Sequence, residues 1–148
     1  MRSAVVSALV VAALGCAAVS EAQAQNTYQQ QVQGYITRAA ATLTQRGYQP
    51  DREPVTGSLA DDARETMNIN LQGGARYAIV GVCDNDCTDV DLRIWDPNGT
   101  KLAEDIATDD TPVLEFTATV TGQYRVSVEM ATCSTAPCYW GFQVFVRR

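Results

Sequence analysis

Apolar residues recur at every second position from about residue 58 to the end of the chain. This spacing puts the apolar side chains of an extended strand on one face of a sheet. The runs end at turn sequences such as Gly73-Gly74, Asp96-Pro97-Asn98-Gly99 and Thr121-Gly122. The pattern predicts an all-β domain over residues 58–148, built as an antiparallel sandwich or barrel. The apolar positions are Met67, Ile69 and Leu71; Tyr77 to Val82; Val90, Leu92 and Ile94; strands at 100–104 and 112–118; Tyr124, Val126, Val128 and Met130; and Trp140, Phe142, Val144 and Val146.

The preceding segment, residues 25–57, has helical rather than strand spacing in its first part. Thr27 and Gln30 have the spacing of a capping box, and Gly47 followed by Pro50 is typical of a helix end. We therefore expect one N-terminal α-helix over residues 27–46 and a linker over residues 48–58. The expected apolar face of this helix consists of Tyr28, Val32, Tyr35, Ala39 and Leu43.

Residues 1–24 have the features of a secretory signal peptide. Arg2 is followed by an uncharged apolar run over residues 4–19, and Ala22-Gln23-Ala24 is a typical cleavage site. A retained membrane anchor is the alternative, but the run is shorter than the roughly 20 residues that span a bilayer. A second alternative is a lipoprotein acylated at Cys16. Cleavage after Ala24 predicts a periplasmic or secreted protein.

Four cysteines follow the predicted cleavage site. Cys83 ends one apolar run and Cys87 precedes the next, and Cys133 and Cys138 stand in the same relation around a later turn. Residues that face each other across a hairpin lie within disulfide reach, which predicts the pairs Cys83–Cys87 and Cys133–Cys138. A zinc site with four cysteine ligands is the alternative, but it requires thiolates in an oxidising compartment.

Composition argues against catalysis and against nucleic-acid binding. The chain contains no histidine. Its formal net charge is −6, and removal of residues 1–24 does not change this charge. Nucleophilic pairs that need histidine are therefore excluded, and a negative chain repels phosphate backbones. Paired carboxylates are the remaining catalytic option. Catalysis by paired carboxylates needs a deep groove, which so small a domain seldom provides, so we expect this protein to have no enzymatic activity.

Four carboxylates, those of Asp84, Asp86, Asp89 and Asp91, lie within one expected turn and the start of the next strand. Calcium prefers such oxygen ligands, so the cluster suggests a calcium site. The amide of Asn85 and a second acidic segment with Asp105, Asp109 and Asp110 provide further oxygens. The alternative is a solvated acidic turn without a metal.

Trp95 is the candidate ligand-binding aromatic residue. If Val90, Leu92 and Ile94 face the core, Trp95 lies on the outer face of its sheet with Asp91 and Arg93. An exposed tryptophan there suits stacking on a sugar ring. Packing beneath the helix at 27–46 is the favoured alternative, because the apolar face of that helix needs a sheet to cover.

From about residue 66 to residue 146 the chain resembles the bacterial pre-peptidase C-terminal domain family. The resemblance implies a jelly-roll-like sandwich that normally accompanies a secreted peptidase, and some members bind calcium. No peptidase domain is present in this chain, so the usual role of the family does not carry over. The residues that carry the resemblance are Gly74-Ala75-Arg76-Tyr77, Cys83-Asp84, Asp89-Val90-Asp91-Leu92, Asp96-Pro97-Asn98-Gly99, Thr121-Gly122-Gln123-Tyr124-Arg125-Val126, Cys133 and Cys138-Tyr139.

Two functional hypotheses follow. The first is an exported, non-catalytic binding or accessory module whose ligand is an unknown protein or glycan. The second is a structural cell-envelope protein, either free or lipid-anchored, without a discrete ligand and with calcium as a clamp on the fold.

Overall fold

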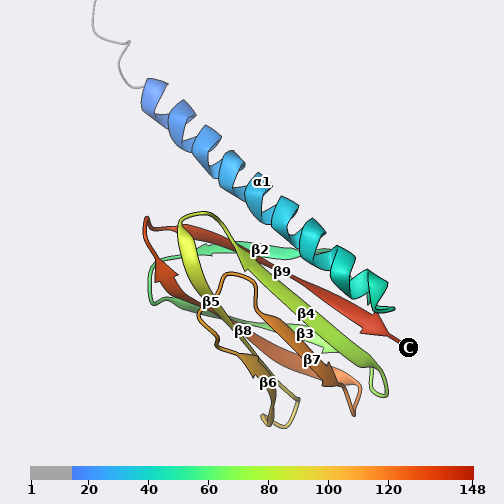
Figure 1. Cartoon of the computed structure of the whole chain (residues 1–148). Coiled ribbons are helices and arrows are strands. Elements are labelled where there is room, and N and C mark those ends of the chain that lie inside the picture. Colours follow the sequence, from blue (N-terminus) through green and yellow to red (C-terminus); the bar gives the residue numbers. More distant parts are fainter. Residues whose placement is uncertain (1–14) are drawn as a thin grey trace, which may run out of the picture.

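The computed structural model describes residues 15–148, and side chains from residue 23 onward. It consists of one long helix that lies across one face of a two-sheet sandwich (Figure 1). Residues 1–14 of the expected signal peptide, and the side chain of Cys16, lie outside what is described. The elements are α1 (Gly15–Gln45), β1 (Gln49–Pro50), β2 (Val55–Leu59), β3 (Arg64–Leu71), β4 (Arg76–Cys83), β5 (Cys87–Trp95), β6 (Lys101–Asp105), β7 (Val113–Thr117), β8 (Gly122–Cys133) and β9 (Cys138–Arg147).

The strand order is that of a jelly roll. One sheet has the order β1-β9-β4-β7, with β2 also paired to β9, and the other has the order β3-β8-β5-β6. Every paired ladder is antiparallel. From β2 onward each sheet draws strands from distant parts of the chain, which is typical of a double Greek key. The predicted fold class, an all-β sandwich preceded by one helix, is confirmed.

The core between the two sheets has the predicted strand register. Val90, Leu92 and Ile94 of β5 are almost fully buried there. Gly81 of β4 faces them from the other sheet, and a Cβ atom at this position would lie 2.9 Å from Leu92 Cδ1. The sheets are therefore in close contact at this point, where a glycine leaves room for a leucine.

Helix α1 covers the outer face of the sheet that contains β9 and β4. Val32 and Ile36 pack on Val82, and Leu43 packs in a second cluster with Val80 and Phe145. Gly141 of β9 permits the close approach, because a Cβ atom there would lie 2.7 Å from Val32 Cγ1. The helical spacing seen in the sequence therefore identifies a real packing face.

The start of the helix and the linker differ from the expectation. Thr27 does not cap the helix: its hydroxyl donates to the carbonyl of Gln23, one turn earlier, inside a helix that is already present at Gly15, the first residue described. Residues 48–58 are not a free linker either, since β1 and the first four residues of β2 pair with β9. The sandwich therefore begins before residue 58, and the capping pattern was outweighed by helix-forming residues on both sides.

The predicted disulfides Cys83–Cys87 and Cys133–Cys138 are both present, with Cα atoms 5.8 Å apart in each pair. The hairpin argument that led to them is wrong, however, because β4 does not pair with β5 and β8 does not pair with β9. Each disulfide joins the end of a strand in one sheet to the start of the next strand in the other sheet. The two disulfides therefore hold one end of the sandwich together, and we call residues 83–87 and 133–138 the disulfide turns.

Reduction of the two disulfides should lower the stability of the fold without abolishing it. Each closes only a short loop, for which the chain-entropy model gives about 2 kcal/mol. The extensive core between the sheets remains after reduction. Thermal melts with and without reductant test this, and non-reduced peptide mapping should recover the same two pairs. A peptide that links residue 83 or 87 to residue 133 or 138 would contradict the pairing.

Candidate functional site

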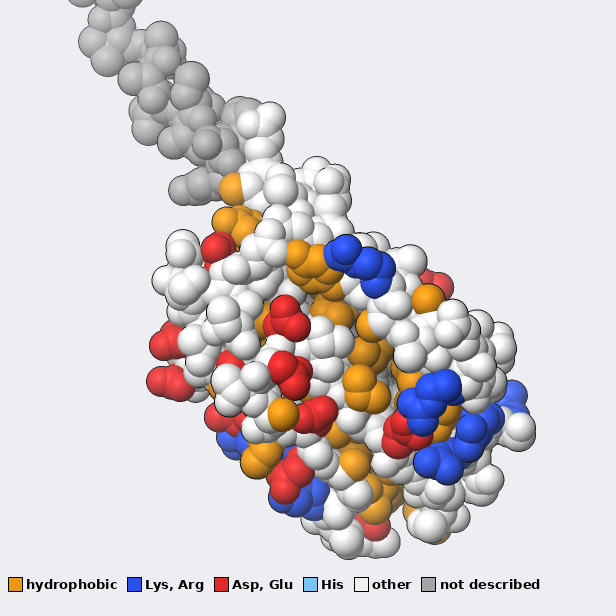
Figure 2. All heavy atoms as spheres, viewed as in Figure 1, with side chains coloured by type: hydrophobic (Ala, Val, Ile, Leu, Met, Phe, Trp, Pro, Cys, Tyr) orange, Lys and Arg blue, Asp and Glu red, His pale blue; other side chains and the backbone are white. Residues whose placement is uncertain are grey.

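The most promising binding surface is a groove between α1 and the loop at residues 106–112, which we call the acidic loop. The groove has a volume of about 320 Å³. Figure 2 shows a band of hydrophobic side chains on this face, with acidic side chains mainly to its left and basic side chains mainly to its right. An apolar floor with a few polar groups around it is typical of binding sites. The lining residues are Tyr35, Arg38, Ala39, Val82, Asp110 and Thr111.

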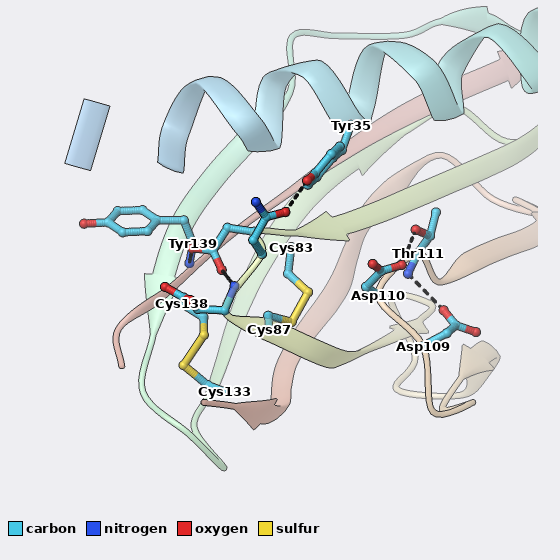
Figure 3. Close-up of a disulfide and its surroundings, with 12 residues drawn as sticks. Tyr35, Cys83, Cys87, Asp109, Asp110, Thr111, Cys133, Cys138 and Tyr139 are labelled. Carbon is cyan, nitrogen blue, oxygen red and sulfur yellow. Dashed lines mark hydrogen bonds between the residues drawn. A yellow bond between two sulfur atoms is a disulfide. The ribbon is translucent and has the colours of Figure 1, made fainter. Parts of the chain in front are cut away.

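The helix wall of the groove is held in place by the first disulfide turn. The Tyr35 hydroxyl donates to Oδ1 of Asn85 (Figure 3), and the backbone amide of Asn85 donates to Oε1 of Gln31 at 3.3 Å. The guanidinium carbon of Arg38 lies 4.7 Å from the centre of the Tyr35 ring, which is a cation–π contact. The Cys83–Cys87 disulfide therefore fixes the turn that positions Tyr35, and Tyr35 in turn positions Arg38.

The acidic loop forms the opposite wall and is shaped by its own carboxylates. Asp109 Oδ1 accepts a hydrogen bond from the Thr111 amide at 2.9 Å, and Asp110 Oδ1 accepts one from the Thr111 hydroxyl, also at 2.9 Å (Figure 3). Asp105 Oδ2 accepts a further bond from the Val113 amide at 2.9 Å. These short-range bonds stabilise a turn without a metal. The groove thus carries a cation on one wall and a carboxylate on the other.

Asp84, the first residue of the predicted calcium set, binds backbone groups of the protein. Its side chain is 2% exposed. Oδ2 accepts from the Tyr139 amide at 2.7 Å, and Oδ1 accepts from the Asp86 amide at 3.1 Å. Burial raises the pKa of Asp84, although these amide hydrogen bonds oppose the effect. Asp84 therefore joins the two disulfide turns, since Tyr139 directly follows the second of them.

The other three carboxylates of the predicted calcium set do not point toward one common site. Asp91 lies on the outer face of the sheet that contains β5 and pairs with Arg93 at 3.1 Å, and burial raises its pKa. The backbone carbonyl of Asp86 accepts two hydrogen bonds from Ser134 at 2.8 Å. Asp89 Oδ1 is buried without a hydrogen-bond partner in the structure. Within residues 15–148 the structure contains no group of three acidic, histidine or cysteine residues placed to hold a metal, so calcium binding stays a prediction of the sequence.

Trp95 lies on the outer face of its sheet, as predicted, and is partly exposed. The expectation that the helix covers it is wrong, because α1 packs on β9 and β4 in the other sheet. The Arg125 guanidinium lies 4.7 Å from the centre of the Trp95 ring instead. This contact occupies one ring face that a sugar would need, so Trp95 is a weaker candidate for glycan stacking than the sequence suggested.

Sequence reasoning identified the groove only in part. It placed Tyr35 and Ala39 on the packing face of the helix and Asp110 in an acidic segment. It did not single out Arg38 or Thr111. No local pattern marks Arg38, since its role depends on the turn at Asn85, far away in the sequence.

Replacement of Asp84 by asparagine should reveal the raised pKa. A carboxyl that binds its proton more tightly in the folded state stabilises the fold at low pH. That stabilisation is lost as the pH rises from 3.8, the pKa of the carboxyl in the unfolded chain, through the higher pKa that it has in the folded protein. Relative to wild type, Asp84→Asn should therefore be most destabilised at a pH below the pKa of the unfolded carboxyl, and less destabilised at neutral pH. Urea unfolding of both proteins across this range tests the sign, and a difference that grows with pH would contradict it.

Comparison with known proteins adds no family assignment. No protein-family model matches the chain, and no curated protein matches it at a significant level. In the residues that the structure describes, no helix is long and apolar enough to cross a membrane.

Proposed function

We propose that this chain is an exported, non-catalytic binding module that holds a segment of a partner protein in the groove between α1 and the acidic loop. The observation that carries the proposal is the groove itself, in which Arg38 and Asp110 border an apolar floor. Charges of both signs beside apolar surface suit a polypeptide, which offers both signs and apolar side chains. The stacking of Arg125 on Trp95 makes a glycan a less suitable ligand on the opposite sheet.

Export is supported by the sequence of residues 1–24 and by the two disulfides. Disulfides persist in oxidising compartments. The proposed mature protein begins at Gln25, after cleavage at Ala24, and is periplasmic or secreted. The resemblance to pre-peptidase C-terminal domains fits an accessory role of this kind. The second hypothesis, an envelope protein without a ligand, predicts that no side chain of the groove affects binding to any partner.

Single charge changes in the groove test the proposal. The oxidised protein is applied to an array of short peptides that carry charges of both signs, with neutral oligosaccharides beside them. Arg38→Gln and Asp110→Asn should each weaken peptide binding by up to about fivefold, because a partly exposed ion pair contributes about 1 kcal/mol or less. Arg64→Gln and Glu65→Gln are the matched controls, since both side chains lie exposed on β3 in the opposite sheet. Equal losses in the groove and control variants would contradict a specific groove site.

A further inference from the structure

We propose that Gln25 is a modification site at which the mature chain acquires an N-terminal pyroglutamate. The inference rests on the cleavage after Ala24 in the proposed function, and it concerns the residue that this cleavage exposes. In the uncut chain Gln25 lies within α1, and its nitrogen is part of a peptide bond. Such a nitrogen is not nucleophilic. Cleavage converts it into a primary amine on the same residue as a carboxamide.

The reaction needs no co-reactant. The α-amine nitrogen attacks Cδ of its own side chain, and a new C–N bond closes a five-membered lactam. The bond from Cδ to Nε2 breaks, and a proton passes from the attacking nitrogen to the leaving nitrogen, which departs as ammonia. No electron is gained or lost, and the chain loses one charged amine and one carboxamide.

The structure leaves both reacting groups accessible while it holds the helix that carries them. Gln25 is exposed to solvent and borders two pockets, one with Gln29 and Trp140 and the other with Asp86. One turn later, the Tyr28 ring stacks on Tyr139 with ring centres 5.6 Å apart. The new N-terminus therefore stays beside the sheet but is not buried by it, so solvent reaches the amine and the carboxamide.

Electrostatics favour the cyclised form. After cleavage Gln25 is the first residue of the helix, where the backbone dipole places a partial positive charge. A protonated amine adds an unfavourable positive charge at that position. The first turn of the shortened helix, residues 25–28, contains no carboxylate that would offset it. Asp86, which borders one pocket together with Gln25, is the one carboxylate among the residues that border the two pockets, and its single negative charge opposes this effect. A neutral lactam removes the conflict.

Mass spectrometry of the exported protein tests the inference. The full-length chain is expressed in a bacterium, recovered from the periplasm with its disulfides intact, and digested. We expect an N-terminal peptide that begins at Gln25, is lighter than the linear peptide by one ammonia, and resists Edman degradation. Gln25→Ala, exported by the same route, should give a linear peptide with a free amine, and deamidation of Asn26 is distinguishable because it raises the mass.

The failures of this inference and of the proposed export are distinguishable. A wild-type peptide that begins at Gln25 and keeps its free amine after prolonged incubation would overturn the pyroglutamate and leave the cleavage standing. A peptide that begins elsewhere, or a diacylglyceryl group on Cys16, would overturn the cleavage and with it this inference.

Discussion

Leu92→Ala should destabilise the fold by about 2–5 kcal/mol, the range for a buried leucine. Leu92 is 1% exposed and belongs to the core between the sheets. Its side chain fills the space above Gly81, so truncation leaves a cavity that neither backbone can close without moving. Urea unfolding monitored by tryptophan fluorescence gives the change. Thr88→Ala on the same strand, where the side chain is exposed, is the control and should have little effect.

Gly81→Ala provides a second test of the same contact. A methyl group at this position would lie 2.9 Å from Leu92 Cδ1 and 3.1 Å from Pro112 Cγ, so the single variant should lose about 1–3 kcal/mol through overpacking. In the double variant Gly81→Ala/Leu92→Ala, the new methyl group at position 81 partly fills the space that the truncated Leu92 side chain leaves. The combined loss should therefore be smaller than the sum of the two single losses. Additive losses would show that the two positions do not face each other.

Asp84→Ala should destabilise the protein by about 2–4 kcal/mol, because it leaves two backbone amides without acceptors. The amides are the backbone amides of Tyr139 and Asp86, which donate hydrogen bonds of 2.7 Å and 3.1 Å to the Asp84 carboxylate. The cost is offset in part, since a buried carboxylate is removed at the same time. Chemical denaturation at neutral pH measures the change.

Asp84→Asn is the matched variant for this prediction. It keeps the shape of the side chain and one acceptor oxygen, so it should lose less than Asp84→Ala. If both variants melt like the wild type, Asp84 does not join the disulfide turns in the way described. If calcium raises the melting temperature of the chelator-treated wild type but not that of Asp84→Asn, Asp84 binds a cation instead, and the calcium prediction from the sequence gains support.

The strands and the disulfide pairs were predictable because both depend on local information. Alternation places Leu92 and Ile94 on one face whatever the partner strand is, and short cysteine spacings admit few pairings. The partner strands were not predictable in the same way. The hairpin expected at Cys83–Cys87 is instead a crossover between sheets, and only the global jelly-roll order decides between the two.

The candidate site was less predictable than the fold for the same reason. The four carboxylates near residue 88 are close in sequence, but Asp84 binds the backbone after the second disulfide turn while Asp91 pairs with Arg93 on an outer face. The groove joins helix residues 35–39 to Asp110 and Thr111, more than seventy residues away, and no spacing rule connects them. The expectation that the helix covers Trp95 was wrong because each of the two sheets has an outer face on which the helix could pack. The sequence did not show that Gly141, in the other sheet, lies beneath the helix and permits its close approach.

The most direct test of a partner-binding groove is site-specific photo-crosslinking in cells that export the protein. A photoreactive amino acid replaces Arg38 or Thr111 on the two walls of the groove, and Thr37 or Asn68 at exposed positions elsewhere. The proposed function predicts one and the same adduct from both groove positions and none from the control positions. Adducts from all four positions, or from the control positions alone, would contradict a binding site in this groove.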